Sequence, residues 1–505
     1  MHPALKKRIL YLCAILLLAA CGGTEEPEFY APAEITSLTV NGQEAELDKK
    51  GFALVATLPT TTDFSSVILS FTIVGEGVFI DGSVIVRDQT RVDATHPLTL
   101  VVRNGRSENK YSLTVRNTGL PVVRIKTPGG REVTSKTDWM ADASMRIENP
   151  DGSLDYEGTM SIRGRGNSPW GYPQKPYALK LDSKSQILGM PKHKRWILLA
   201  NWKDRTLLRN AAAFWLSRQT GLAYTVRGQF VEVEFNGKHV GNYYLCEQIK
   251  IDKNRVDVEE MEAGETDPEL ITGGYLLELD TYYDEVNKFR SSRFLLPYQF
   301  KEPDEDALST AAFNYVKNYI TELERILKDP EQVKAHAYEP YLDVDSAIWF
   351  MFVNELANNT DFYSTWPFDG PHSVYFYKPR GGKIYSGPVW DFDYHGFVPT
   401  YSKQWAGADK TLYYPALYGD EKFCARMLEL WEKNKNTFLG LTDYIDQMAE
   451  KIRVSEEINQ QIWPIPQWQS ENGDERMDFS AAVERMKKGF TDKWTWMDAH
   501  LGDLK

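Results

Sequence analysis

The sequence predicts an α+β protein in which a small all-β unit precedes a larger mixed unit. Short runs that alternate apolar and polar residues, separated by turn residues, occupy residues 34–117. After residue 310, apolar residues recur at spacings of three and four, which is typical of amphipathic helices. The chain of 505 residues is also longer than one ordinary domain. We therefore expect two folded units, at residues 33–118 and 119–505.

The N-terminus is typical of an export signal. A basic start at residues 1–8 precedes an apolar run at residues 9–20, which is too short to span a bilayer permanently. Small residues and then Cys21 end this run, as in bacterial lipoprotein signals. That resemblance implies a signal peptide at residues 1–20, acylation of the Cys21 thiol and anchoring without a membrane span. An ordinary secretory signal with a coincidental cysteine is the alternative.

Residues 21–32 are predicted to form a polar tether between the lipid and the first folded unit. The acidic stretch at residues 24–28 resembles the surface-export signals of Bacteroidetes lipoproteins. We therefore expect a protein of the cell envelope that is lipid-anchored at the outer membrane, where it is either displayed on the outer face or faces the periplasm. The membrane is then one partner of the chain, reached through the lipid on Cys21.

Composition and charge narrow the function further. The chain is 42% hydrophobic and 13% aromatic, as in folded globular proteins, and its net charge of −13 argues against nucleic acid as a partner. The sequence contains no CxxC motif, no cysteine–histidine cluster with zinc spacing and no GxSxG motif. After export, Cys246 and Cys424 remain, and the sequence leaves open whether they pair or stay free.

The first folded unit, residues 33–118, is expected to be a small immunoglobulin-like β-sandwich. Its predicted strands are Ile35–Val40, Val67–Val74, Leu98–Val102 and Tyr111–Val115. No chemistry-bearing motif occurs in it, so we expect a spacer. A glycan-binding or protein-binding role is the alternative.

The second unit opens with a glycine- and arginine-rich hairpin. A strand enters a loop at residues 160–170, which carries Arg163 and Arg165, and a strand with Lys175 and Lys180 returns. Glycines let backbone N–H groups approach phosphate oxygens, and Arg or Lys adds charge-assisted contacts. The loop has no Walker GxxxxGK[ST] pattern and only the first half of a kinase GxGxxG pattern. Alone it is a weak indication of phosphate binding.

The middle of the chain is predicted to be β-rich with one long helix. We expect Thr206 to cap this helix, and Asp204, Arg209 and Asn210 to serve as capping residues and surface salt bridges. The clearest hairpin turns at Asn236-Gly237. The expected strands are residues 194–200, 229–235, 239–247, 273–280 and 298–303.

Two polar segments stand out in the helical remainder. An apolar helix, Val344–Ala357, is expected to be buried and to deliver Asn359 and Asp361 into the interior. About thirty residues on, Asp391 and Asp393 flank a phenylalanine. Buried acidic groups are costly unless compensated, and a divalent cation that holds a phosphate is one such compensation. The alternative is a strand end whose aspartates cap turns.

Several segments together resemble the spore coat protein H (CotH) family of atypical secretory kinases. The resemblance runs from about residue 162 to residue 396, and the domain is expected to fill the C-terminal three-quarters of the chain. The matching segments are Arg163-Gly164-Arg165-Gly166-Asn167-Ser168, Lys175-Pro176-Tyr177, Trp196-Ile197-Leu198-Leu199-Ala200-Asn201, Asp204-Arg205-Thr206-Leu207-Leu208-Arg209-Asn210, Asn236-Gly237-Lys238-His239-Val240-Gly241-Asn242-Tyr243, Glu247-Gln248, Gly273-Gly274-Tyr275, Asn359-Thr360-Asp361 and Pro388-Val389-Trp390-Asp391-Phe392-Asp393.

The resemblance implies a kinase-like fold, with a β-rich N-lobe and a helical C-lobe, that phosphorylates protein Ser or Thr with ATP and Mg²⁺ or Mn²⁺. It implies Asp361 as the base near the acceptor hydroxyl. Asn359, Asp391 and Asp393 are the implied metal ligands. Asp393 stands where kinases carry glycine, so the nucleotide geometry need not be kinase-like.

The phosphate side of the implied site is less defined. Besides Arg163 and Arg165, the phosphate-binding lysine is Lys175, Lys180 or Lys301, and Glu247, with Glu278 as second choice, is expected to orient it. The acceptor protein is not identified by the sequence. A non-catalytic surface scaffold, or a glycan- or protein-binding lipoprotein with the same fold, is the alternative function, because ATP is scarce outside cells.

Overall fold

The structure is a computed structural model that describes residues 32–48, 50–58, 62–363, 370–466, 469 and 471–504. The predicted signal segment and Cys21 lie outside the described residues. The chain is a mixed α+β protein, as predicted, and it divides into two compact units, one that ends at Arg116 and one that begins at Asn117. Within those ranges, no helix combines the length and the apolar character needed to cross a bilayer.

The first unit consists of two antiparallel sheets that share one apolar core. One sheet has the order β2-β1-β5-β8 and the other β3-β4-β10-β9-β6-β7. Leu38 and Leu69 enter the core from the first sheet, and Leu54, Leu100 and Leu113 enter it from the second. The strands are β1 (Glu34–Val40), β2 (Gln43–Glu44), β3 (Glu46–Asp48), β4 (Ala53–Leu58), β5 (Val67–Val74), β6 (Gly77–Ile80), β7 (Ser83–Ile85), β8 (Arg91–Val92), β9 (Leu98–Asn104) and β10 (Ser107–Asn117).

The second unit begins with a closed β-barrel. Its strands are β11 (Val122–Lys126), β12 (Met140–Glu148), β13 (Leu154–Gly164), β14 (Tyr177–Ile187), β15 (Met190–Leu199), β16 (Gly228–Phe235) and β17 (Lys238–Glu247). The order is β11-β12-β13-β14-β15-β17-β16, and parallel pairing of Val123 with Val233 closes it. The inward side chains, Trp196 and Leu198 among them, form a separate core.

A five-stranded sheet follows the barrel. It has the order β19-β20-β18-β21-β22. Its strands are β18 (Tyr275–Leu279), β19 (Lys288–Arg290), β20 (Pro297–Glu302), β21 (Val374–Lys378) and β22 (Tyr385–Ser386). Helix α3 (Thr310–Leu327) packs against this sheet, where Phe313 stacks on Phe300 with ring centroids 5.3 Å apart. The central strand β18 is buried along its whole length.

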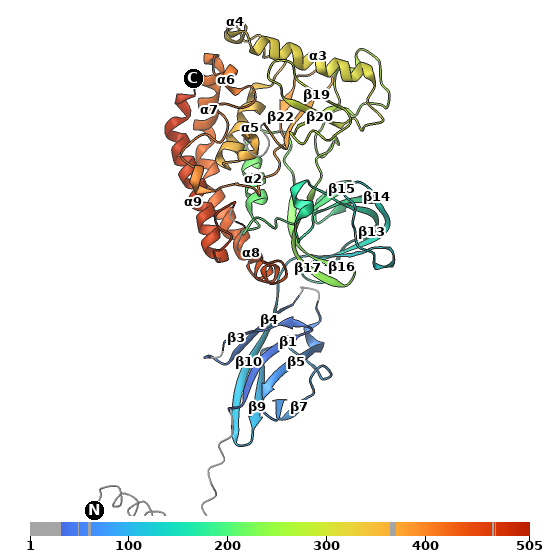
Figure 1. Ribbon diagram of the computed structural model, residues 1–505, viewed down its shortest axis with the longest axis vertical. Helices are drawn as coiled ribbons and strands as arrows, with labels where there is room; N and C mark the ends of the chain where they lie inside the picture. The colour runs from blue at the N-terminus through green and yellow to red at the C-terminus, as the bar shows by residue number, and fades with distance from the viewer. Residues whose placement is uncertain are drawn as a thin grey trace, which may run out of the picture. The chain divides into compact units, whose positions relative to one another are not determined.

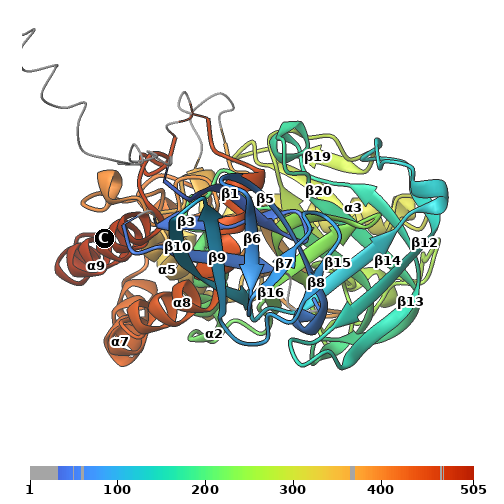
Figure 2. The same ribbon diagram turned by 90° about the horizontal axis from the view of Figure 1, so that it is seen from below.

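The remaining helices form the C-terminal half of the second unit. They are α2 (Arg209–Arg218), α4 (Pro330–Lys334), α5 (Val344–Leu356), α6 (Tyr414–Leu417), α7 (Glu421–Phe438), α8 (Leu441–Ile462) and α9 (Phe479–His500). Figures 1 and 2 show α7, α8 and α9 together on one side of this unit, with barrel strands β12 to β14 on the other. Helix α5 is buried from Ser346 to Leu356, as its uniformly apolar middle predicts.

The predicted start of α2, with Thr206 as its cap, is two residues too early. Helix α2 begins at Arg209, because the preceding residues form a separate turn around Asp204. The Asp204 carboxylate accepts hydrogen bonds from the Thr206 backbone N–H (2.9 Å) and the Thr206 hydroxyl (2.6 Å). Its second oxygen accepts from the Arg209 backbone N–H at 2.8 Å. Thr206 therefore belongs to this turn and does not cap the helix.

The predicted surface salt bridges around Arg209 are also wrong, because these side chains are buried. Arg209 is 1% exposed, and it pairs with Asp204 and with Asp474, both of which are 0% exposed. Its Nε donates to the Gly396 carbonyl at 2.7 Å. Burial opposes the charge, but the two carboxylates outweigh it and raise the pKa of Arg209 above its usual value. Arg209 thus joins α2, the segment after Asp393 and the α8–α9 loop.

Arg209→Leu is expected to lower the free energy of unfolding of the second unit by about 3–5 kcal/mol, because it leaves two buried carboxylates without their cation. Denaturant unfolding followed by tryptophan fluorescence measures this change. The matched control is Arg325→Leu, which removes an exposed Arg325–Glu322 pair and should cost less than about 1 kcal/mol. Equal losses in the two variants would contradict a structural role for the buried network.

Candidate active site

A cavity of about 880 Å³ lies within the second unit. Three parts of the fold line it: the β13–β14 loop with barrel strands β14 and β15, the inner strands β18, β20 and β21 of the five-stranded sheet, and loops of the helical half. Of the residues predicted for the site, Arg163, Arg165, Lys301, Asp361, Asp391 and Asp393 line this cavity. The tertiary structure therefore brings together residues that are up to 230 positions apart in the chain.

Asp361, Asp391 and Asp393 form one side of the cavity, which we call the acidic wall. Burial, together with the nearby Asp391 carboxyl group, raises the pKa of Asp393 to about 8. Burial also raises the pKa of Asp391, against the opposing charge of Arg165. Burial, Asp391 and Asp393 raise the pKa of Asp361 well above its usual range. Such a cluster strongly favours a cation in the cavity.

The end of helix α5 positions Asp361. The Asn359 amide donates to Asn354 Oδ1 at 2.9 Å, and its oxygen accepts from the Asp361 backbone N–H at 3.0 Å. The Asp361 carbonyl in turn accepts from the His372 backbone N–H at 2.9 Å. Asn359 is 3% exposed and does not line the cavity. It thus holds the turn that carries Asp361.

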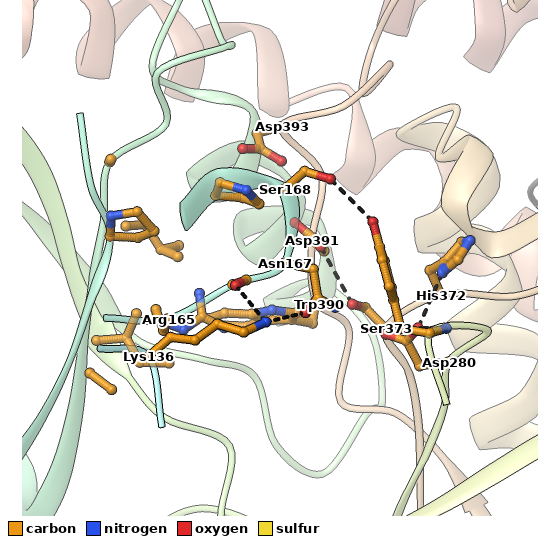
Figure 3. A pocket seen from close by; sticks show the side chains of 18 of the residues that line it. Lys136, Arg165, Asn167, Ser168, Asp280, His372, Ser373, Trp390, Asp391 and Asp393 are labelled. Atoms are coloured by element: carbon orange, nitrogen blue, oxygen red, sulfur yellow. Dashed lines mark hydrogen bonds and ion pairs between the residues drawn. The ribbon is translucent and has the colours of Figure 1, made fainter. Parts of the chain in front are cut away.

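A left-handed residue orients the Asp391–Asp393 segment. Asp391 has φ = +67°, a conformation that is costly for a residue with a side chain. The next backbone N–H, of Phe392, donates to Asn210 Oδ1 at 2.9 Å, and the Phe392 ring is fully buried. Ser373 Oγ donates to the Asp391 carboxylate at 3.4 Å (Figure 3). The strain is therefore held by one buried amide, one hydroxyl and one buried ring.

Basic side chains of the β13–β14 hairpin and of the segment between β11 and β12 line the same cavity. The Arg165 guanidinium lies 5.3 Å from the centre of the Trp390 ring, beside Asp391 (Figure 3). The Arg163 guanidinium stacks on Trp139 at 4.6 Å. Lys136, which also lines the cavity, donates to Asn167 of the glycine-rich loop at 2.9 Å. These cations can contact an anionic ligand that enters the cavity.

Lys301 reaches the same cavity from strand β20. Its ammonium lies 3.2 Å from Glu278 and 2.5 Å from Glu285. Burial alone would lower the pKa of Lys301, but these carboxylates outweigh it and raise the pKa. Glu278, the second choice in the sequence, therefore sits beside Lys301.

The other predicted phosphate-side residues lie elsewhere. Glu247 is buried and accepts hydrogen bonds from the Tyr224 hydroxyl (3.0 Å) and the Arg227 side chain (2.9 Å). Lys175 donates to the Trp170 carbonyl at 2.7 Å, and Lys180 is exposed on β14. None of the three lines the cavity.

Sequence reasoning missed four cavity-related residues, Asp280, Lys203, Glu471 and Asn472. Asp280 follows buried strand β18 and lies 3.2 Å from His372. The position of this aspartate directly after a mostly apolar strand could have indicated a site residue. Glu471 and Asn472 lie in the α8–α9 loop. In this segment the sequence indicated only that prolines interrupt a helical region. Asp474, which pairs with the buried Arg209, follows Glu471 and Asn472 in the same loop.

The residues present fit a divalent cation that is shared with a phosphate. Among the described residues, no three acidic, histidine or cysteine side chains converge closely enough to hold a metal by themselves. Magnesium usually takes one or two carboxylates and completes its shell with water and substrate phosphates. Asp391 and Asp393, half-buried and with raised pKa values, offer such a donor set beside the basic side chains.

Comparisons with solved structures give only partial likenesses. A candidate glycoside hydrolase from Bacteroides thetaiotaomicron is 19% identical, with 35% of this chain and 54% of that chain covered and a TM-score of 0.15. A DUF4623 family protein from Bacteroides eggerthii is 10% identical, with 34% and 58% covered and a TM-score of 0.14. The chain thus spans little more than half of either structure, and these likenesses support no conclusion about function. Curated proteins gave no significant match.

The family comparison is decisive. The profile described as "CotH kinase protein" matches residues 162–497, which is more than half of the chain and includes every described residue of the acidic wall. This confirms the resemblance that the sequence motifs predicted. The chain belongs to the CotH kinase family.

Proposed function

We propose that this protein transfers the γ-phosphoryl group of ATP to a hydroxyl group of a protein Ser or Thr side chain, with Mg²⁺ or Mn²⁺. The observation that carries the proposal is the meeting, in one cavity, of Asp361, Asp391 and Asp393 with Arg163 and Arg165. A triphosphate–metal complex needs carboxylates for the cation and cations for the phosphate oxygens. Membership of the CotH kinase family supports the same reaction.

The cavity offers distinct surroundings for the two ends of the nucleotide. Ala178, Ile197 and Leu199 form an apolar part that suits the base. Arg163 and Arg165 come from the glycine-rich hairpin and suit the phosphates, and Lys301 adds a third cation that Glu278 holds in place. Asp391 and Asp393 would hold the metal, which when bound neutralises charge on the phosphate oxygens.

Asp361 is the proposed acceptor of the hydroxyl proton. As the acceptor oxygen bonds to the γ-phosphorus, the bond from that phosphorus to the bridging oxygen of ADP breaks. ADP leaves with the bonding electron pair, and the hydroxyl proton passes to the Asp361 carboxylate. The backbone bonds to Asn359 and His372 fix Asp361 for this role. Catalysis then rests on positioning and charge neutralisation.

The wider organisation follows from the sequence. We propose that the barrel with the five-stranded sheet acts as a kinase-like N-lobe and the helical half as a C-lobe. The two-sheet first unit acts as an immunoglobulin-like spacer, and a lipid on Cys21 anchors the chain at the outer membrane with the catalytic unit on the outer face. The buried Cys246 and Cys424 are free thiols in this structure.

A non-catalytic scaffold is the second candidate function. The observation that favours it is the burial of Asn359, whose amide oxygen serves the Asp361 backbone and does not face the cavity. In that case the acidic wall would bind a cation such as Ca²⁺ without nucleotide. The response of the melting temperature to Mn²⁺–ATP and to Ca²⁺ separates the two functions.

ATP with Mn²⁺ is expected to raise the melting temperature of the purified exported chain, because a ligand that binds only the folded state stabilises it. When the ligand concentration is one hundred times the dissociation constant, the free energy of unfolding rises by about 2.7 kcal/mol. Asp391→Ala should abolish this shift, whereas Asp409→Ala, at an exposed position outside the cavity, should keep it. A shift with Ca²⁺ alone and none with Mn²⁺–ATP would favour the scaffold.

Asp361→Asn is expected to lower phosphoryl transfer by about 10²–10⁴-fold, the usual contribution of a general base. The amide keeps the size of the side chain, so the Mn²⁺–ATP thermal shift should persist. Transfer of labelled γ-phosphate from ATP to generic protein acceptors measures the rate. Undiminished transfer in this variant would remove Asp361 from the reaction.

A further inference from the structure

Lys203 is a cavity-lining cation that the roles above do not use. It follows strand β15, so it comes from a different segment than Arg163 and Arg165. Its ammonium lies 2.5 Å from Glu471 and 4.7 Å and 5.7 Å from the ring centres of Tyr172 and Tyr394. Its side chain is only 16% exposed. Such enclosure is unlike an exposed surface ion pair.

The backbone fixes Lys203 beside the acidic wall. Asn472 donates to the Lys203 carbonyl at 3.2 Å and to the Asp393 carbonyl at 3.1 Å, so one side chain ties the two segments together. The charge of Lys203 acts on both Asp361 and Asp393, where it opposes the rise of their pKa values. Lys203 is therefore next to the place where the acceptor hydroxyl and the γ-phosphoryl group would meet.

A phosphoryl group can replace Glu471 as the ionic partner of Lys203. The Glu471 side chain is 37% exposed, so it can turn to solvent at little cost. The two tyrosine rings would keep the ammonium in place after such an exchange, because aromatic faces attract cations. A phosphoryl oxygen with developing negative charge can then replace the carboxylate as the partner of Lys203.

Building on the proposed function, we propose that Lys203 is a catalytic residue that binds the transferring phosphoryl group on its acceptor side. Glu471 is a positioning residue that holds the ammonium when no phosphoryl group is present. Lys203 stays protonated throughout: the acceptor proton goes to Asp361, and the electron pair of the broken bond leaves with ADP. The lysine acts by stabilising negative charge that grows during transfer.

The test compares Lys203→Met, Lys203→Arg and Glu471→Gln with wild type in the labelled-ATP transfer assay. Lys203→Met should lower kcat by about 10²–10³-fold, which is typical for the loss of one charge-stabilising donor. The KM for ATP should stay within about threefold, because other cations hold the nucleotide. Lys203→Arg should restore part of kcat, and Glu471→Gln should lower kcat by less than about tenfold. Lys422→Met, which removes an exposed lysine paired with Glu339, is the matched control.

A second measurement tests the contact between Lys203 and the phosphoryl group in the absence of an acceptor protein. ADP with Mg²⁺ and aluminium fluoride mimics the transferring group, so wild type should bind it more tightly than ADP with Mg²⁺. Lys203→Met should bind the aluminium fluoride complex at least tenfold more weakly than wild type does. Its affinity for ADP with Mg²⁺ should stay within about twofold of the wild-type value. If wild type transfers phosphate and Lys203→Met matches it in both assays, the Lys203 inference is overturned alone. If wild type binds neither nucleotide complex and transfers no phosphate, the proposed function itself is overturned.

Discussion

The buried pairing of Arg209 with Asp204 and Asp474 is the interaction on which the rest of the second unit depends. One guanidinium joins the start of α2, the α8–α9 loop and, through the Gly396 carbonyl, the segment that follows Asp393. Burying three charges is expensive, so the arrangement persists only because each charge has a partner at hydrogen-bond distance. The same network thereby fixes both the core and one wall of the cavity.

The cavity combines crowded carboxyl groups with a strained backbone, and a bound cation would reduce the repulsion between these groups. Three carboxylates share one wall with raised pKa values, and Asp391 holds a left-handed backbone conformation. Neighbouring buried groups, Asn210 and Phe392 among them, hold this geometry in place. Strain and charge crowding of this kind occur mainly at functional sites, because they prepare the site for its ligand. A metal–phosphate complex would compensate both the acidic wall and the basic side chains that face it.

The family match and the site geometry complement each other. The family profile covers residues 162–497 and so identifies the domain, whereas the cavity decides which of its polar residues can meet a ligand. Two expectations changed in consequence. Glu278, not Glu247, accompanies a cavity lysine, and Asn359 supports the Asp361 turn from behind. The Asp204–Asn210 segment, expected at the surface, became the internal support of the acidic wall.

The sequence by itself determined the α+β class, the buried helix α5, the hairpins, the family and the acidic pair at Asp391 and Asp393. These follow from local periodicity, turn residues and short motifs, which need no knowledge of distant partners. Only the tertiary structure decided the closed barrel, the Lys301–Glu278 pair and the approach of Lys203, Glu471 and Asn472 to the site. Those contacts join segments far apart in the chain, and local sequence patterns carry no information about which distant side chains pack together.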